Sequence, residues 1–400
     1  MSNEQGTDRR TFIKTAVAGG AGLTLGGRVA LGAEGEAGAA DHARVPRKEL
    51  GSTGAKIPIL LLGCAQRFDP KYDKLLHRAY RAGVDYLDTA LAYEGGMSHK
   101  TIAPFIKQIG GKDKLWITSK VVSKGLDPAE YESGIDTCLE QLEVDHLDLF
   151  FLHALDDARA LDKPYRDVGD RLRSSGKTRF FGFSCHGDRV VELLEKAARV
   201  GGFDAIMFRY HFGKYGDLAL NRAIDACRKA GIGLIAMKTQ KSVPADAERV
   251  IGFKSRDFTL PQAKLKAVWA DERIDAVVSH MDNTRKLAEN VAAARSPQQL
   301  SMAEFQQLQR LATATAPLSC EGCSRHCEPA AGVPLPIADT LRVLMYHECY
   351  GETAKARRLF AELHPAGLRI ERADLAAASR ACPQGIDIAA RLRQARQALA

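Results

Sequence analysis

From residue 57 onward, short apolar runs rich in β-branched residues alternate with longer windows in which apolar residues recur at helical spacing. This alternation predicts parallel strands joined by crossover helices. The predicted strands are residues 57–63, 84–88, 115–120, 147–153, 180–184, 205–208, 233–237 and 276–279. Eight strand–helix units in about 250 residues fit a (β/α)8 TIM barrel. The competing fold, an open doubly wound sheet, would carry a glycine-rich phosphate loop after the first strand, and Gly63-Cys64-Ala65-Gln66-Arg67 is no such loop.

Helix boundaries can be read from capping residues. In Asp127-Pro128-Ala129-Glu130, Asp127 is expected to be the N-cap and Glu130 to occupy the capping-box position. Three further helices, near residues 72–81, 188–200 and 218–230, lead into glycines suited to a left-handed C-cap, namely Gly83, Gly201 and Gly231.

Composition changes this interpretation little. The chain has 400 residues, 45% hydrophobic and 26% charged, which suits a globular enzyme with one large and one smaller domain. Its net charge of +8 raises the question of a nucleic-acid partner. Lys and Arg are scattered beside Asp and Glu, however, and the longest basic block is Lys-Ala-Arg-Arg ending at Arg358. This pattern indicates solvated helix faces and no nucleic-acid binding.

The N-terminus carries a targeting pattern. Paired Arg9 and Arg10 are followed by Phe12, an aliphatic residue and Lys14, which resembles the twin-arginine export signal. An Ala-, Gly- and Leu-rich stretch follows and is too weakly apolar to form a stable membrane span. We expect residues 1–39 to be a signal peptide read by the twin-arginine translocase, which would make the protein periplasmic. A disordered tail is the alternative.

Polar residues mark three consecutive predicted strand ends. Asp88, Lys120 and His153 close the second, third and fourth strands, and Tyr93 lies in the loop after Asp88. Taken singly, each has a structural explanation, as a helix cap, a surface charge, a buried imidazole or a half-buried aromatic ring. TIM-barrel active sites gather at the carboxyl ends of the strands, so together these four residues indicate an active site.

The same residues resemble the aldo/keto reductase family over roughly residues 45–316. The matching segments are VDYLDTA at 84–90, ITSK at 117–120, LFFLH at 149–153, GFS at 182–184, AMK at 236–238 and EN at 289–290. The resemblance implies that NADPH or NADH delivers hydride to a small carbonyl substrate, or accepts it from the corresponding alcohol. Tyr93 would be the general acid, Lys120 would favour its phenolate, Asp88 would hold Lys120, and His153 would orient the carbonyl.

The cofactor side departs from the family pattern. Where the family has Ser-Asn and a later Gln, this chain has Ser184, Cys185 and Met207, and His186 is a candidate for the missing hydrogen bond. The resemblance implies a dinucleotide site of Ser184, Cys185, His186, Met207, Tyr210, Met237, Lys238, His280, Arg285, Lys286, Glu289 and Asn290. Reduced cationic charge around His280 leaves the choice between NADPH and NADH open.

Cysteines gather at the C-terminus. Cys320, Cys323 and Cys327 form C-x2-C-x3-C, and a later Cys-Pro begins at Cys382. This region, residues 317–400, resembles the ferredoxin-like extension of some aldo/keto reductases, which implies that these four cysteines hold a [4Fe-4S] cluster. Zinc is an alternative, as are disulfides or free thiols.

Other cysteines are expected to be structural. Cys349 should be buried on a helix, within an insertion at residues 336–380 that separates Cys382 from the other three. The barrel, residues 46–316, holds four more cysteines that we expect to serve as small apolar residues: Cys64, Cys138, Cys185 and Cys227. The sequence thus leaves open a carbonyl reductase, or an exported electron-transfer or partner-binding protein that uses a bound dinucleotide, a cluster and a redox partner protein. A third alternative, a catalytically silent binding module on a reductase scaffold, is disfavoured by the presence of Tyr93 and Lys120.

Overall fold

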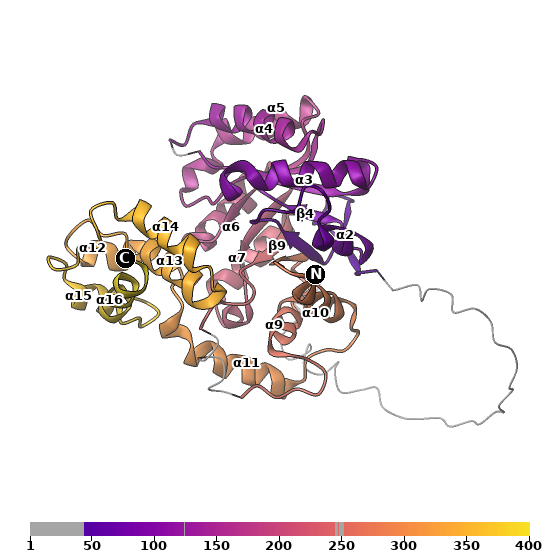
Figure 1. The fold of residues 1–400 in the computed structure, drawn as a ribbon. Helices are drawn as coiled ribbons and strands as arrows, with labels where there is room; N and C mark the ends of the chain where they lie inside the picture. The colour runs from indigo at the N-terminus through magenta and orange to yellow at the C-terminus, as the bar shows by residue number, and fades with distance from the viewer. Residues whose placement is uncertain (1–43, 124, 245–246, 248–251) are drawn as a thin grey trace, which may run out of the picture. The chain divides into compact units, whose positions relative to one another are not determined.

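The computed structural model describes residues 44–123, 125–244, 247 and 252–400, and its central element is a closed barrel of parallel strands (Figure 1). The chain divides into two compact units, Met1–His42 and Ala43–Ala400, and the features below belong to the second. Around the barrel the strand order is β10-β3-β4-β5-β6-β7-β8-β9. This closure confirms the predicted TIM barrel and excludes the open sheet. The expected signal peptide, residues 1–39, lies outside the described residues.

The strands match the predicted runs closely. They are β3 (Leu60–Gly63), β4 (Tyr86–Asp88), β5 (Trp116–Val121), β6 (Leu147–Leu152), β7 (Thr178–Cys185), β8 (Ala205–Arg209), β9 (Gly233–Met237) and β10 (Ala276–His280). The first predicted run, 57–63, is wrong as a single strand. Its start forms β2 (Lys56–Pro58), which pairs antiparallel with β1 (Arg47–Glu49) outside the barrel. Pro58 has no amide hydrogen to continue a ladder, which explains why β3 begins only at Leu60.

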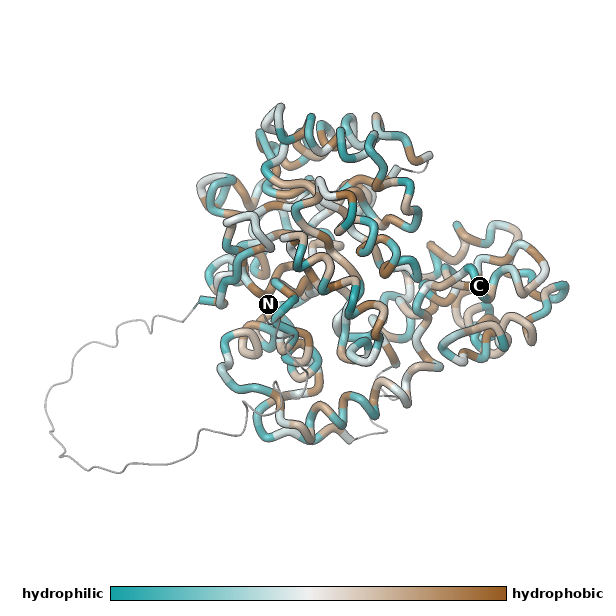
Figure 2. Tube along the Cα trace, turned by 180° about the vertical axis from the view of Figure 1, so that it is seen from behind, coloured by the Kyte–Doolittle hydropathy of each residue, from teal (hydrophilic) through white to brown (hydrophobic). Residues whose placement is uncertain are grey.

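Two apolar layers stabilise the barrel. Along β6, Leu149 and Phe151 pack with other strand residues in the barrel interior, while Phe150 and Leu152 pack in the layer shared with the helices. Successive side chains of a strand point to opposite faces, so an uninterrupted apolar run serves both layers. Figure 2 shows hydrophobic (brown) and hydrophilic (teal) residues alternating along the outer coils of the chain, as expected of helices with one buried face.

The helices follow the predicted windows. Those that cover the barrel are α2 (Lys74–Arg81), α3 (Met97–Gln108), α4 (Pro128–Leu142), α5 (Lys163–Ser174), α6 (Val190–Val200), α7 (Leu218–Lys229), α9 (Leu260–Trp269) and α10 (Thr284–Arg295). Asp127 caps α4 as expected, but its carboxylate accepts from the Ala129 amide, one position before the predicted capping box at Glu130. Gly83 and Gly231, after α2 and α7, have the expected positive φ of +85° and +77°.

The C-terminal region has its own apolar core. After α11 (Met302–Ala314) come α12 (Ser324–Ala330), α13 (Ile337–Tyr350), α14 (Thr353–Leu363), α15 (Leu375–Arg380) and α16 (Ile388–Leu399). The core packs Leu341 and Leu344 of α13 against Phe360 of α14 and Leu392 of α16. We call residues 317–400, which include α12 to α16, the C-terminal domain. Its helices are drawn in light orange and yellow in Figure 1. In the described part of the chain, none of the helices combines the length and apolar character needed to cross a membrane.

Candidate active site at the barrel mouth

The four predicted catalytic residues lie together at the carboxyl ends of β4, β5 and β6. Asp88 is the last residue of β4, Lys120 is on β5, and His153 directly follows β6. Tyr93 opens the short helix η1 (Tyr93–Gly96) that follows β4. Backbone pairing of β4 with β5 and of β5 with β6 sets these positions, so the fold itself brings the four side chains to one site.

Lys120 is the centre of the hydrogen-bond network. Its Nζ donates to Asp88 Oδ2 at 2.8 Å, to the Thr89 carbonyl at 2.7 Å and to the Tyr93 hydroxyl at 3.4 Å. The Lys120 side chain is 1% exposed and that of Asp88 4%. A buried ammonium is costly without a counter-charge, and Asp88 supplies it.

Burial and charge act against each other at this site. Burial alone would lower the pKa of Lys120, but the neighbouring Asp88 and Tyr93 raise it above its usual value. Burial raises the pKa of Tyr93, although the Lys120 ammonium opposes this effect. At neutral pH the site therefore holds a protonated phenol beside a protonated amine, which is the state needed to donate a proton and to stabilise the phenolate that remains.

His153 lies edge-on to Tyr93, with ring centroids 5.6 Å apart and ring planes at 80°. Burial and the nearby Lys120 charge lower the pKa of His153 to about 3, so the imidazole is neutral at physiological pH. Its Nδ1 is buried and accepts or donates no hydrogen bond within the described residues. A neutral ring beside the phenol is suited to orient a carbonyl oxygen through its other nitrogen.

Only some of the residues predicted to bind the dinucleotide have side chains at the carboxyl ends of the barrel strands. Ser184 Oγ accepts from the Ala154 amide at 2.9 Å, beside His153, and Met207 and Met237 pack in the barrel interior. The assignment of Cys185 is wrong. Its side chain is 0% exposed and packs in the layer between strands and helices, because it follows inward-facing Ser184 on β7 and so points outward.

Tyr210 needs the same correction. Its hydroxyl donates to Asp271 Oδ2 at 2.6 Å, and its fully buried ring lies in the outer apolar layer. The preceding residue, Arg209, lines the cavity at the barrel mouth instead. The alternation along β8 thus places Arg209 where the resemblance predicted Tyr210.

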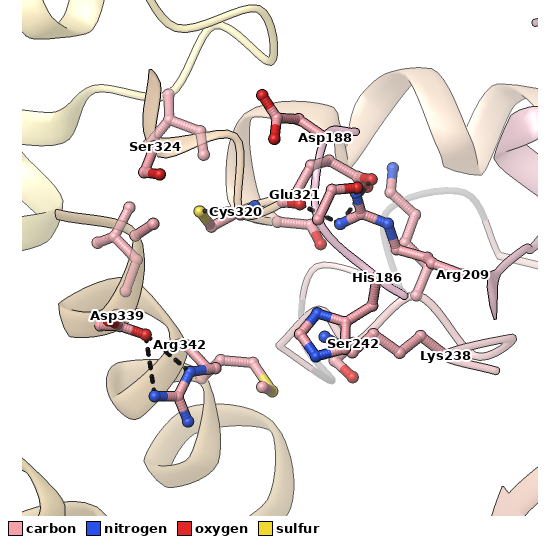
Figure 3. A pocket seen from close by; sticks show the side chains of 18 of the residues that line it. His186, Asp188, Arg209, Lys238, Ser242, Cys320, Glu321, Ser324, Asp339 and Arg342 are labelled. Carbon is pink, nitrogen blue, oxygen red and sulfur yellow. Dashed lines mark hydrogen bonds and ion pairs between the residues drawn. The ribbon is translucent and has the colours of Figure 1, made fainter. Parts of the chain in front are cut away.

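That cavity measures about 320 Å³ and lies between the strand ends and the C-terminal domain (Figure 3). His186 and Lys238 of the predicted cofactor set line it, and sequence reasoning missed Arg209, Glu321 and Arg342 in its wall. Burial, together with the Arg209 and Arg342 charges, lowers the pKa of Lys238 to about 8. The Lys238 side chain makes no hydrogen bond or ion pair with any described residue.

The remaining predicted cofactor residues lie apart from this cavity, around the start of α10. His280 and Arg285 are exposed, and Lys286 pairs with Asp282 at 2.6 Å. Glu289 and Asn290 are engaged within the protein: Glu289 Oε1 accepts from Thr259 Oγ1 at 2.6 Å, and Asn290 Nδ2 donates to Ser279 Oγ at 2.9 Å. The predicted set is thus dispersed: His186 and Lys238 line the cavity, and the others lie beside His153, in the barrel interior, in the outer apolar layer or around the start of α10.

Glu321 joins the C-terminal domain to the barrel. Its carboxylate lies 3.1 Å from Arg209, 3.6 Å from His211 and 3.4 Å from Lys214. These charges hold the pKa of Glu321 well below its usual range although burial opposes them. Glu321 stands inside the C-x2-C motif, so its charge was visible in the sequence, but its partners lie more than 100 residues earlier and no local pattern connects them.

The four predicted ligand cysteines, Cys320, Cys323, Cys327 and Cys382, line one small second cavity. Burial raises the pKa of Cys320 to about 11 and that of Cys327 to about 12. Over the described residues, no group of three or more His, Cys, Asp or Glu side chains is arranged as a metal site. Cys382 nevertheless lies with the first three despite the intervening helices, as the sequence predicted.

The other cysteines have structural positions. Cys64, Cys138, Cys185 and Cys227 are 0% exposed and belong to the outer apolar layer of the barrel, as expected of small apolar residues. Cys349 is on α13 as predicted but is only partly buried, and it lines the larger cavity.

With this geometry established, the chain can be compared with known proteins. Residues 65–243 match the model of the Aldo/keto reductase family. L-galactose dehydrogenase of Arabidopsis thaliana is 22% identical over 292 residues, which are 65% of this chain and 91% of that protein. An aldo-keto reductase of Gibberella moniliformis is 27% identical over 144 residues, which are 34% of this chain and 43% of that protein. The residues that match the family model lie within the barrel, so the likeness to aldo/keto reductases is a likeness of that part of the chain.

Solved structures agree on the fold. An aldo-keto reductase from Bacillus halodurans in its holo form superposes with a TM-score of 0.58 at 19% identity, covering 68% of this chain and 97% of that one. A thermostable aldo-keto reductase in complex with the inhibitor epalrestat gives a TM-score of 0.55 at 25% identity, with coverage of 66% and 99%. The likeness covers about two-thirds of the chain.

Proposed function

We propose that this protein is an aldo/keto reductase that transfers hydride between a nicotinamide dinucleotide and a small carbonyl or alcohol substrate. The observation that carries the proposal is the buried Lys120 ammonium, which bonds to both Asp88 and the Tyr93 hydroxyl. A buried charge held beside a phenol has little structural value, because an apolar residue of the same volume would pack at lower cost. Its chemical value is direct, since it lowers the cost of forming the phenolate.

Each side chain has a defined task in this proposal. Tyr93 donates the proton to the substrate oxygen, and Lys120 stabilises the phenolate that results. Asp88 keeps Lys120 charged and in place, and neutral His153 orients the oxygen by a hydrogen bond. When bound, NADPH or NADH would supply the hydride. In the reverse direction the same residues accept the proton of an alcohol.

The cavity at the barrel mouth fits part of such a cofactor. Lys238 is a cation without a protein partner among the described residues, flanked by Arg209 and Arg342, and this charge suits a phosphate group. His186 and Ser184 are the candidates on the nicotinamide side. An aldo-keto reductase from Klebsiella pneumoniae with the same fold has been solved in complex with NADPH.

The test is Tyr93→Phe, assayed with NADPH and NADH on a panel of aldehydes and ketones. Loss of the general acid should reduce turnover by about 10²–10⁴-fold while dinucleotide binding stays close to normal. Tyr72→Phe is the matched control, because Tyr72 is 53% exposed and its ring stacks on His77 and not on a residue of the proposed site. Unchanged turnover in Tyr93→Phe on any accepted substrate removes Tyr93 from this role.

A second function rests on the cysteine-lined cavity. We propose that Cys320, Cys323, Cys327 and Cys382 hold a [4Fe-4S] cluster that exchanges electrons with a partner protein. Four thiolates suit such a cluster and also suit zinc. The four cysteines line one small cavity, of about 10 Å³. Iron, sulfide and zinc analysis of anaerobically purified protein distinguishes the two.

We also propose that residues 1–39 direct export to the periplasm by the twin-arginine translocase. The support is the Arg9–Arg10 pair with its flanking Phe12 and Lys14. Replacing Arg9 and Arg10 together by lysine should leave the precursor in the cytoplasm. Equal amounts of parent and variant in the periplasmic fraction would show that the segment is not this signal.

A further inference from the structure

The wall of the larger cavity comes from two parts of the chain. His186, Arg209 and Lys238 belong to the barrel, whereas Asp339, Arg342 and Tyr350 belong to the C-terminal domain. Figure 3 shows His186 and Lys238 on one side of the hollow and Arg342 on the other. A ligand at the barrel mouth therefore meets side chains of the C-terminal domain as well.

Specific contacts hold that second wall over the strand ends. Arg325 of α12 pairs with Asp188 at 2.5 Å, and Lys355 of α14 pairs with Glu94, the neighbour of Tyr93, at 3.2 Å. Tyr350 of α13 shares a hydrogen bond with Ser242, which follows β9. Together with Glu321 these contacts fix the C-terminal domain on the barrel, so the placement of Arg342 is defined by the fold.

The cationic side chains that line the cavity differ in how fully they are paired with acidic or carbonyl groups. Arg209 is committed to Glu321 and to the Gly187 carbonyl. Arg342 bonds to Asp339 at 2.9 Å and to the Tyr346 hydroxyl, but its side chain is still 42% exposed. Lys238 makes no ion pair among the described residues, and the Arg209 and Arg342 charges oppose its own. Several carboxylates line the same cavity, but Glu321, Asp339 and Glu348 are paired with arginines, so Lys238 and the exposed part of Arg342 are the cations left to meet an anionic ligand group.

We propose that Arg342 of the C-terminal domain and Lys238 of the barrel together bind the pyrophosphate of the dinucleotide, which is thereby enclosed between the two parts of the chain. The inference rests on the proposed function, and it adds a cofactor-binding residue outside the barrel. A dinucleotide held from both sides should be released more slowly than one held by the barrel alone.

The test measures binding and release of NADPH by the full-length protein, followed by nucleotide fluorescence, in Arg342→Gln, Arg342→Lys and Lys238→Met. A charge-assisted hydrogen bond to phosphate is worth roughly 10- to 100-fold in affinity, so Arg342→Gln and Lys238→Met should each weaken binding by that factor. Arg342→Lys should retain most of the affinity. Inorganic pyrophosphate should compete with NADPH for the parent protein and compete less well in Arg342→Gln.

Two controls separate binding from structure. Asp339→Asn removes the carboxylate partner of Arg342 but keeps the cation, so affinity should stay equal or rise. Arg358→Gln changes an exposed arginine of α14, paired with Glu362, and should have no effect. Salt should weaken NADPH binding less in Arg342→Gln than in the parent protein.

The outcomes are distinct. If the parent binds NADPH and Arg342→Gln binds it equally well, the inference is wrong and the proposed function stands. Equal weakening in Arg342→Gln and Asp339→Asn also overturns it, because the arginine would then serve only the structure of α13. If the parent binds neither NADPH nor NADH, the proposed function fails and the inference fails with it.

Discussion

The Asp88–Lys120–Tyr93 site and the four-cysteine cavity are both enclosed, but different interactions hold them together. In the barrel, parallel strands bring the proposed catalytic groups together, and the buried Lys120 ammonium is matched by the Asp88 carboxylate at 2.8 Å. In the C-terminal domain, Cys382 reaches the other three cysteines only through packing of short helices, and burial raises the pKa of the Cys320 and Cys327 thiols. The charges of the barrel site are matched by protein groups, whereas at the cysteine site the proposed metal would stabilise the thiolate form of its ligands.

The comparison predicts the largest effect at Lys120. Lys120→Met removes the charge that stabilises the Tyr93 phenolate and leaves the Asp88 carboxylate buried without its partner. Turnover should fall by about 10²–10⁴-fold, and the free energy of unfolding should drop by about 3–5 kcal/mol. Steady-state rates and urea denaturation measure the two effects. Normal stability combined with normal turnover would contradict the role assigned to this pair.

The next largest effect is expected in the C-terminal domain. Cys382→Ser should lose most of the iron and make residues 319–400 sensitive to protease, while the barrel stays folded because its apolar layers are separate. Cys349→Ser is the matched control, since Cys349 lines the larger cavity and not the cysteine-lined one. Full iron occupancy in Cys382→Ser, or iron loss only in Cys349→Ser, would identify a different fourth ligand.

Glu321→Gln tests the connection between the two regions. The pKa of Glu321 is depressed in the folded protein, so its charge stabilises the fold above the unfolded carboxyl pKa of about 4.3, and this contribution is lost as pH falls towards the folded pKa. The variant should be about 3 kcal/mol less stable at pH 7, with the difference shrinking below about pH 4. Thermal unfolding across this range measures it, and a pH-independent difference would exclude a charge effect.

The smallest effect is expected at Cys185. Cys185→Ala should change dinucleotide affinity by less than about twofold and cost about 1 kcal/mol of stability, because the thiol packs in the outer apolar layer. Ser184→Ala, at the adjacent inward-facing position, provides the contrast in the same titration. A large loss of dinucleotide affinity in Cys185→Ala would show that Cys185 does belong to the cofactor site.

The barrel and its catalytic residues could be predicted from sequence because their signals are local. Apolar runs define the strands, and the catalytic side chains stand at strand ends that the fold brings together. The orientation of Cys185 and Tyr210 could not be predicted from sequence. It depends on which face of the sheet each residue occupies at β7 and β8, and both faces are apolar. Arg342 and Glu321 were missed for another reason: their role depends on how the C-terminal domain packs on residues more than 100 positions away.

Isotope transfer tests the central claim most directly. The full-length protein is incubated with NADPH carrying two deuterium atoms at C4 of the nicotinamide and with a panel of aldehydes and ketones, and the alcohol products are analysed by mass spectrometry. Our account predicts one deuterium on the carbinol carbon, and no labelled product with Tyr93→Phe beyond a trace. Alcohol formed without the label, or no labelled alcohol from any carbonyl although NADPH binds, would contradict hydride transfer at this site.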